Sequence, residues 1–329
     1  MLAVLVVLGA CGGGNSAGTE ENTNPAAGTA GPAQSAGENA PHGQALYWRT
    51  VEENNGPYIV DGAGHRAPLR RYRRIILSSP GAVEVLYMIG AEAAIAALTS
   101  GRDPIWPEEK TALLPTVGNT ARPNLEAIVA QKPDLIIGNA MNAALIEDLS
   151  SRGYTVLVHN TGSLGDIFNS AVLLGALTGK EAEARRLVSE KETQLEALKA
   201  ELQSDPPNLR GAFLYSVNPI MAFTSQSLAG EILDILGVTN IAAGLNAAQP
   251  ILSPEYILAE NPDFLFGAMS ITKPEDILGA DSVIAKTRAG RERNIRIVPS
   301  SLFLRSSPRI VDSLLELSGE IKKYAKPGI

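Results

Sequence analysis

Short β-rich runs alternate with helical stretches through much of the 329-residue chain. Residues 74–78 predict a strand, and Pro80 begins a helix through Met88 from the first helical position, where its missing N–H costs nothing. Further strands are predicted over 94–98, 114–117, 135–138 and 155–158, with helices over 123–131 and 143–152 between them. This alternation predicts a mostly parallel sheet with helices on both faces.

The alternation stops between Asp166 and Leu202, where apolar residues keep a helical spacing with one interruption at Gly179. We predict one helix of up to about 35 residues, or about 50 Å, ending before Pro206. A second α/β unit follows, with strands over 212–217, 263–266 and 295–298 and helices over 228–236, 254–259 and 309–324. The predicted fold class is α/β, with two Rossmann-like lobes bridged by a single long rigid helix and a ligand cleft between them.

The N-terminus predicts export and a lipid anchor. An apolar run over residues 1–10 ends in small residues and is followed by Cys11, the only cysteine of the chain. Residues 8–11, Leu-Gly-Ala-Cys, resemble the lipobox of bacterial lipoproteins, in which signal peptidase cuts before the cysteine and the thiol carries a diacylglycerol. The alternative is a buried free cysteine, but no predicted element around Cys11 could bury it.

Residues 12–45 have three acidic side chains, no Lys or Arg and no apolar periodicity, and therefore predict a flexible tether. The predicted domains are a signal peptide over 1–10, a lipidated cysteine and disordered tether over 11–45, an N-terminal α/β lobe over 46–165, the linking helix over 166–205 and a C-terminal α/β lobe over 206–329.

Composition excludes several classes of protein. The net charge of −7, without a basic stripe carrying aromatic side chains, disfavours nucleic acid as a partner. No window after Cys11 reaches the roughly 18 apolar residues that span a bilayer, so the membrane is expected to be met only through the lipid. Catalytic motifs are missing, and three histidines with one cysteine cannot assemble a three-histidine metal site. We therefore expect no enzyme, no intrinsic cofactor and no directly bound metal.

The order and spacing of several motifs resemble the substrate-binding lipoproteins of ABC importers for iron-siderophore, haem and cobalamin, whose lobes are joined by a rigid helix. The matching stretches are 74–91, 114–118, 123–137, 228–240 and 253–263. The resemblance implies a monomeric, extracytoplasmic lipoprotein of the periplasm or cell surface. It would capture a small-molecule ligand and deliver it to a permease and its ATPase.

Lys132-Pro133-Asp134 and Asn261-Pro262-Asp263 suggest an internal pseudo-repeat, one unit per lobe. Glu126 and Glu255 stand at equivalent places in it, in the first turn of the preceding helix. In the family, acidic residues at these places dock each lobe onto arginines of the permease, so the resemblance implies this role for both. A first-turn Glu also complements the helix dipole, and both roles can hold at once.

Ligands of open α/β sheets bind beyond the carboxyl ends of the strands. The predicted contacts are Ser79, Trp106, Asn119, Thr120, Asn139, Met141 and His159 in the first lobe, and Tyr215, Asn218, Met221, Phe303 and Arg305 in the second. Trp106 is expected to be a stacking wall and Arg305 an anchor for an anionic group. The alternatives are a Trp packed on its own loop, a surface arginine and, for His159, an ordinary residue at a strand end.

The ligand predicted first is a chelated metal complex of iron-siderophore type. Cobalamin, haem or a molybdate-like oxyanion are the alternatives within the same fold, and a lipid-anchored adhesion or structural module is the alternative from another class. Haem would need an axial His or Tyr, available from His159, Tyr215 or Tyr256. Hydroxamate binders of the family carry an arginine where this chain has Asn119-Thr120, which weakens the hydroxamate interpretation.

Overall fold

The computed structural model describes residues 47–245, 250–300 and 305–325, all within one compact unit of the chain, Ser35–Ile329. The predicted lipidation site Cys11, the predicted tether up to residue 45 and the predicted ligand contact Phe303 lie outside the described residues.

The N-terminal lobe is built on a six-stranded sheet in the order β7-β6-β5-β4-β8-β9. The strands are β4 (Ile75–Leu77), β5 (Ile95–Ser100), β6 (Thr116–Asn119), β7 (Arg122–Pro123), β8 (Leu135–Gly138) and β9 (Val156–Val158), and only the β6–β7 pair in this sheet is antiparallel. Its helices are α1 (Pro80–Met88), α2 (Glu108–Thr111), α3 (Leu125–Ala130) and α4 (Ala143–Ser151), with short 3₁₀ turns over Glu92–Ala94 and Ala140–Asn142. A small antiparallel sheet of β1 (Arg49–Glu53), β2 (Gly56–Val60) and β3 (Arg66–Pro68) precedes it.

The alternation of side chains along β4 shows why this sheet is covered on both faces. Ile75 and Leu77 belong to the core that contains α1 and α5 (Leu164–Thr178), whereas Ile76 packs with residues of α3 and α4. Successive side chains of a strand point to opposite faces, so a strand that is apolar at every position needs helices on both sides.

The C-terminal lobe repeats this plan. Its sheet has the order β11-β10-β13-β14, with β12 paired to β10, and only the β10–β11 pair is antiparallel. The strands are β10 (Leu209–Val217), β11 (Ile220–Ala222), β12 (Val238–Asn240), β13 (Phe264–Gly267) and β14 (Ile295–Ile297). The helices are α7 (Leu228–Ile235), α8 (Pro254–Glu260), α9 (Pro274–Leu278), α10 (Arg288–Arg291) and α12 (Ile310–Tyr324), with a 3₁₀ turn over Ile284–Lys286. The predicted α/β fold class is confirmed.

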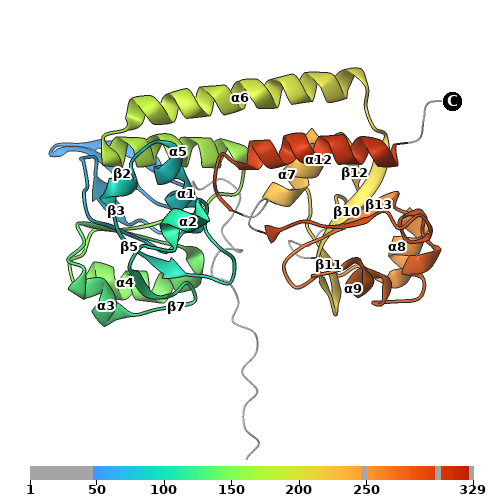
Figure 1. Ribbon diagram of the computed structural model, residues 1–329, viewed down its shortest axis with the longest axis horizontal. Coiled ribbons are helices and arrows are strands. Elements are labelled where there is room, and N and C mark those ends of the chain that lie inside the picture. The colour runs from blue at the N-terminus through green and yellow to red at the C-terminus, as the bar shows by residue number, and fades with distance from the viewer. Residues whose placement is uncertain (1–46, 246–249, 301–304, 326–329) are drawn as a thin grey trace, which may run out of the picture. The chain divides into compact units, whose positions relative to one another are not determined.

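The predicted continuous helix between Asp166 and Leu202 is wrong. Two helices, α5 and α6 (Glu181–Ser204), fill this region and pack against each other as a hairpin (Figure 1). Gly179 ends α5 in the left-handed conformation with φ of 72°, and the Lys180 N–H donates to the Gly175 carbonyl oxygen at 2.7 Å. This is a glycine C-cap of the Schellman type.

Helix α6 alone therefore links the lobes, with 24 residues and a length of about 36 Å at 1.5 Å per residue. It packs on α5 and on α12. Lys191 in α6 donates to an Asp312 carboxylate oxygen at 2.5 Å, and Lys322 in α12 pairs with Glu201. The linking element is thus supported along its length by helices of both lobes.

The same set of hydrogen bonds stands just before β8 in the N-terminal lobe and just before β13 in the C-terminal lobe. In the N-terminal lobe the Asp134 carboxylate accepts the Arg74 N–H at 2.9 Å, and the Arg74 side chain donates to the Gln131 carbonyl oxygen. In the C-terminal lobe the Asp263 carboxylate accepts the Arg210 N–H at 2.8 Å, and the Arg210 side chain donates to the carbonyl oxygen of residue 260. The partners 131 and 260, like 134 and 263, are 129 residues apart, as the pseudo-repeat requires.

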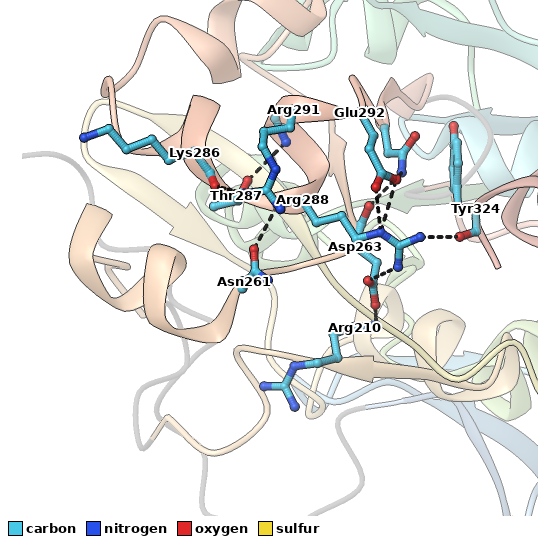
Figure 2. A network of polar contacts seen from close by, with 11 residues as sticks. Arg210, Asn261, Asp263, Lys286, Thr287, Arg288, Arg291, Glu292 and Tyr324 are labelled. Carbon is cyan, nitrogen blue, oxygen red and sulfur yellow. Dashed lines mark hydrogen bonds and ion pairs between the residues drawn. The ribbon is translucent and has the colours of Figure 1, made fainter. Parts of the chain in front are cut away.

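Asp263 has a further partner that extends this set of hydrogen bonds in its lobe. Figure 2 shows Arg288 between Asp263, Glu292 and the Tyr324 carbonyl oxygen, and its backbone N–H donates to the Asn261 side chain at 2.9 Å. The Arg288 guanidinium, only 16% exposed, thereby ties the start of β13 to α10 and to the end of α12.

The close approach of α5 and α6 at Gly175 leads us to expect that a larger residue there destabilises the protein. A Cβ atom there would lie 2.6 Å from Ala184 Cβ and 2.8 Å from the Lys180 carbonyl oxygen, so Gly175→Ala must push the helices apart. We expect the free energy of unfolding in urea to fall by about 1–3 kcal/mol. The control is Gly319→Ala in α12, where nothing lies within 4 Å of the new Cβ and the better helix former should be neutral or stabilising. Equal effects of both variants would contradict the close helix approach.

Candidate ligand-binding site

A cavity of about 940 Å³ lies between the two lobes. The N-terminal lobe contributes Pro80, Ser100, Gly101, Arg102, Asp103, Asn119, Thr120, Ala121 and Met141, and the C-terminal lobe contributes Tyr215, Met269, Ser270, Ile271, Thr272, Ile297, Val298, Pro299, Ser300 and Arg305. Nearly all of them stand at or just after the carboxyl ends of β4, β5, β6, β8, β13 and β14. The cavity therefore occupies the place where parallel α/β sheets bind ligands.

Backbone hydrogen bonds fix the wall that the N-terminal lobe supplies. The Asn119 side-chain oxygen accepts the N–H groups of Ala121 at 3.0 Å and Arg122 at 2.8 Å. The Thr120 N–H donates to the Ser100 carbonyl oxygen at 2.8 Å, and its hydroxyl lies 3.0 Å from that of Thr99. The ends of β5 and β6 are thus held together by hydrogen bonds within the lobe.

The C-terminal wall is held in a similar way. The Met269 N–H donates to the Ser300 hydroxyl at 3.0 Å, and the Ser270 hydroxyl donates to the Tyr215 carbonyl oxygen at 2.7 Å. Met269 has a φ of 58°, and its side chain is 51% exposed, while Met141 on the other wall is 72% exposed. Two flexible, polarizable thioethers therefore reach the cavity from opposite lobes.

The two arginines that line the cavity differ in whether they have a partner within the protein. Arg305 donates to a carboxylate oxygen of Glu84 at 3.0 Å and to the Asp103 carbonyl oxygen at 3.3 Å, and Arg309 approaches the same Glu84 oxygen at 3.3 Å. Glu84 is only 1% exposed. Arg102, in contrast, is exposed and has no side-chain partner among the described residues. Among the described lining residues, the Arg102 guanidinium is therefore the positive charge that a ligand could pair with.

Five of the predicted contacts line the cavity: Asn119, Thr120, Met141, Tyr215 and Arg305. Arg305 is already paired with Glu84 there, and its side chain is only 11% exposed.

Ser79 and His159, two further predicted contacts, lie instead in the core of the N-terminal lobe at 5% and 4% exposure. His159 Nδ1 is 2.7 Å from the Ser79 hydroxyl, and Nε2 is 3.0 Å from the Ser170 hydroxyl. Because Ser170 donates its own proton to the Ile167 carbonyl oxygen, Nε2 must carry the imidazole proton and Nδ1 must accept from Ser79. Both ring nitrogens of His159 are thus engaged within the protein.

Trp106, Asn139, Asn218 and Met221 are not among the lining residues. The Trp106 ring carries the Arg309 guanidinium 4.7 Å from its centroid, a contact with a segment outside its own loop, and Trp106 is 39% exposed. Asn139 donates to the Ser78 carbonyl oxygen at 2.7 Å and caps the following 3₁₀ turn. Asn218 precedes a cis proline at the β10–β11 turn, and Met221 lies in β11.

The sequence interpretation missed Arg102 and Asp103. Both follow β5 directly, so the rule that placed ligands beyond strand ends would have found them with the correct end of that strand at Ser100. The predicted end at residue 98 drew attention to Trp106 further along the loop.

Within the described residues, no group of three or more His, Cys, Asp or Glu side chains could hold a metal ion. No helix there is long and apolar enough to cross a bilayer.

Two α/β lobes with a ligand-sized cavity between their strand ends define a two-lobed solute-binding protein. The chain belongs to the periplasmic binding protein family, whose model matches residues 75–302. The family resemblance inferred from the motifs is thereby confirmed, and so is the prediction that the chain is not an enzyme.

Relatives of known name agree with this assignment. The vitamin B12-binding protein of Vibrio parahaemolyticus is 25% identical over 252 residues, 74% of this chain and 87% of that protein. The ferric-anguibactin-binding protein FatB of Vibrio anguillarum is 26% identical over 63% of this chain and 69% of its own length. The apo structure of the periplasmic heme-binding protein RhuT from Roseiflexus sp. RS-1 shares the fold with a TM-score of 0.69 at 21% identity, covering 78% of this chain and 100% of RhuT.

Because His159 is buried, we expect the folding stability to depend on pH. Burial lowers the pKa of His159 from 6.5 to about 4. As the pH falls from 6.5 towards 4, the imidazole of His159 binds a proton in the unfolded chain but stays neutral in the folded protein. Protonation therefore favours unfolding, and the free energy of unfolding decreases over this pH range. The shift corresponds to about 3 kcal/mol.

Urea unfolding of the wild type and of His159→Gln at pH values across this window measures the effect. The variant should be less stable at neutral pH because it loses the Ser79 and Ser170 contacts, and it should lose less stability on acidification. Parallel pH profiles for the two proteins would contradict the buried neutral imidazole.

Proposed function

We propose that this chain is the substrate-binding component of an ABC importer and that it carries a bulky metal chelate, of iron-siderophore type, between its lobes. The observation that supports this most is the cavity of about 940 Å³ formed by strand ends of both lobes. Two relatives are named as binding proteins for vitamin B12 and for ferric anguibactin, which supports a chelate as the ligand.

The size and lining of the cavity favour a chelate over a small ion. A tetrahedral oxyanion of the molybdate type would leave most of the volume unfilled. Met141, Met269 and Ile297 offer apolar surface, and Arg102 offers one exposed cation. A ligand with a large apolar body and an anionic edge fits this combination.

A chelate also agrees with the scarcity of metal ligands in the chain, which has three histidines and one cysteine. The metal would already be bound by an organic chelator when the protein captures it, so the protein need not supply metal ligands. Of the three residues considered as axial ligands to haem, His159 is buried, and the Tyr256 hydroxyl donates to the Ile241 carbonyl oxygen at 2.6 Å. Tyr215 lines the cavity and keeps haem as the second candidate.

Delivery to the permease is proposed to use Glu126 and Glu255, and the accompanying ATPase would drive the transport. Both carboxylates are exposed, each at the second position of its helix, α3 or α8. Cys11 is proposed to carry the lipid that anchors a monomeric protein to the bacterial membrane, in the periplasm or at the cell surface.

Ligand binding is tested by thermal shift with a panel of ferric siderophores, ferric citrate, cobalamin, haem and molybdate. A ligand present at 100 times its Kd should stabilise the fold by about 2.7 kcal/mol. For an anionic chelate, Arg102→Ala should weaken binding about tenfold, whereas Arg122→Ala, an exposed arginine outside the lining, should not. Stabilisation by molybdate alone would contradict the chelate assignment.

Lipidation is tested by Cys11→Ser. The variant should leave the membrane fraction for the soluble fraction, because a lipid chain is the anchor the proposal gives this protein. Fractionation after a high-salt wash measures this, with wild type as the control. Retention of Cys11→Ser in the washed membranes would count against the lipid anchor.

A further inference from the structure

The helices that carry Glu126 and Glu255 are equivalent at every position. Residues 125–131 and 254–260 have the same sequence of exposed, half-buried and buried positions, offset by 129 residues. Each helix is capped by the side chain of the residue before it: Asn124 accepts the Ala127 N–H, and Ser253 accepts the Tyr256 N–H. The two surfaces are thus copies of one another in backbone and burial.

The equivalence extends to the side chains that face outward. Three residues after each Glu stands an exposed aliphatic side chain, Val129 at 40% exposure and Leu258 at 37%. An exposed alanine follows each of them. Residues three apart are neighbours on a helix surface, so each glutamate has an apolar side chain beside it on the same face.

The fold explains the buried part of this repeat but not the exposed part. Ile128 and Ile257 fill the two cores, and Asp134 and Asp263 hold the following strands. One exposed aliphatic residue needs no explanation. The same outward pair of a carboxylate and an aliphatic side chain, placed identically in both lobes, has no role in either core.

Neither glutamate is engaged by the protein itself. In the part of the chain that the structure describes, the carboxylates of Glu126 and Glu255 accept no hydrogen bond and form no ion pair. A carboxylate that is left open beside an apolar side chain suits a basic group set next to an apolar surface. Two identical patches suit a partner that offers this chemistry twice, as a symmetric dimer does.

We propose that Val129 and Leu258 are docking residues, each inserted into an apolar surface beside a basic side chain on the membrane permease. This inference rests on the proposed function, since it names the permease as the partner. The two residue types have separate roles: the glutamates steer and orient the encounter, and the aliphatic side chains hold the complex once it has formed.

The test uses the full chain and the cognate permease–ATPase complex in lipid nanodiscs, with binding followed by surface plasmon resonance at low and high salt. The variants are Val129→Ser, Leu258→Ser and the double variant. The matched control is Leu315→Ser, which removes a side chain of equal exposure, 39%, from α12. Circular dichroism and thermal melting of each variant show that it is folded.

Each docking variant should weaken binding roughly fivefold, mostly through faster dissociation and equally at both salt concentrations. The double variant should show about the product of the two effects. Leu315→Ser should bind as the wild type does. Glu126→Gln and Glu255→Gln should instead slow association, and more so at low salt.

Two failures are distinguishable. If the wild type binds, the glutamate variants slow its association, and the serine variants equal Leu315→Ser, the aliphatic docking residues are wrong while the proposed function stands. If the wild type does not bind the permease at all, the proposed function itself fails.

Discussion

The cavity depends on one buried carboxylate. Glu84 in α1 is 1% exposed, and its charge is balanced by Arg305 and Arg309 from the segment that follows β14. An unpaired buried carboxylate is costly, and removing one partner of such a pair typically costs about 3–5 kcal/mol. This requirement holds a segment of the C-terminal half against the N-terminal lobe at the edge of the site.

Close packing supports this contact. A Cβ atom on Gly81 would lie 2.4 Å from the Ser306 carbonyl oxygen, so only glycine lets the segment approach α1. The Thr161 and Ser306 hydroxyls add a hydrogen bond at 2.5 Å. The chain thus joins the two lobes through α6 and through this contact between α1 and the segment that follows β14. The Arg309 guanidinium also stacks on the ring of Trp106, which is itself 39% exposed.

The regular elements could be predicted because their signals are local. Strand and helix periodicity, the Pro80 helix start and the two Pro-Asp junctions are each readable within a few residues. Gly179 stood out as an interruption, but one helix was predicted across it because apolar spacing continues on both sides, while the left-handed cap that ends α5 depends on that one residue. Local patterns therefore gave the order of elements but not the direction of the chain after the turn.

The site was predictable only in part, for the same reason. Asn119, Thr120 and Met141 were found because strand ends meet at one edge of a sheet. The pairing of Arg305 with Glu84 joins residues 221 positions apart, and the burial of His159 depends on Trp48 and Ser170. Neither contact leaves a trace in the neighbouring sequence, so both side chains were predicted as open to a ligand.

Methionine oxidation can report whether a ligand occupies the space between the two lobes. Met141 and Met269 reach the cavity from opposite walls, whereas Met88 lies in α1 outside the lining. Hydrogen peroxide treatment with and without a saturating ligand, read by mass spectrometry, reports each sulfur separately. A bound ligand should slow oxidation of both Met141 and Met269 and leave the oxidation rate of Met88 unchanged. Binding that protects neither methionine, or only one wall, would contradict a ligand position between the lobes.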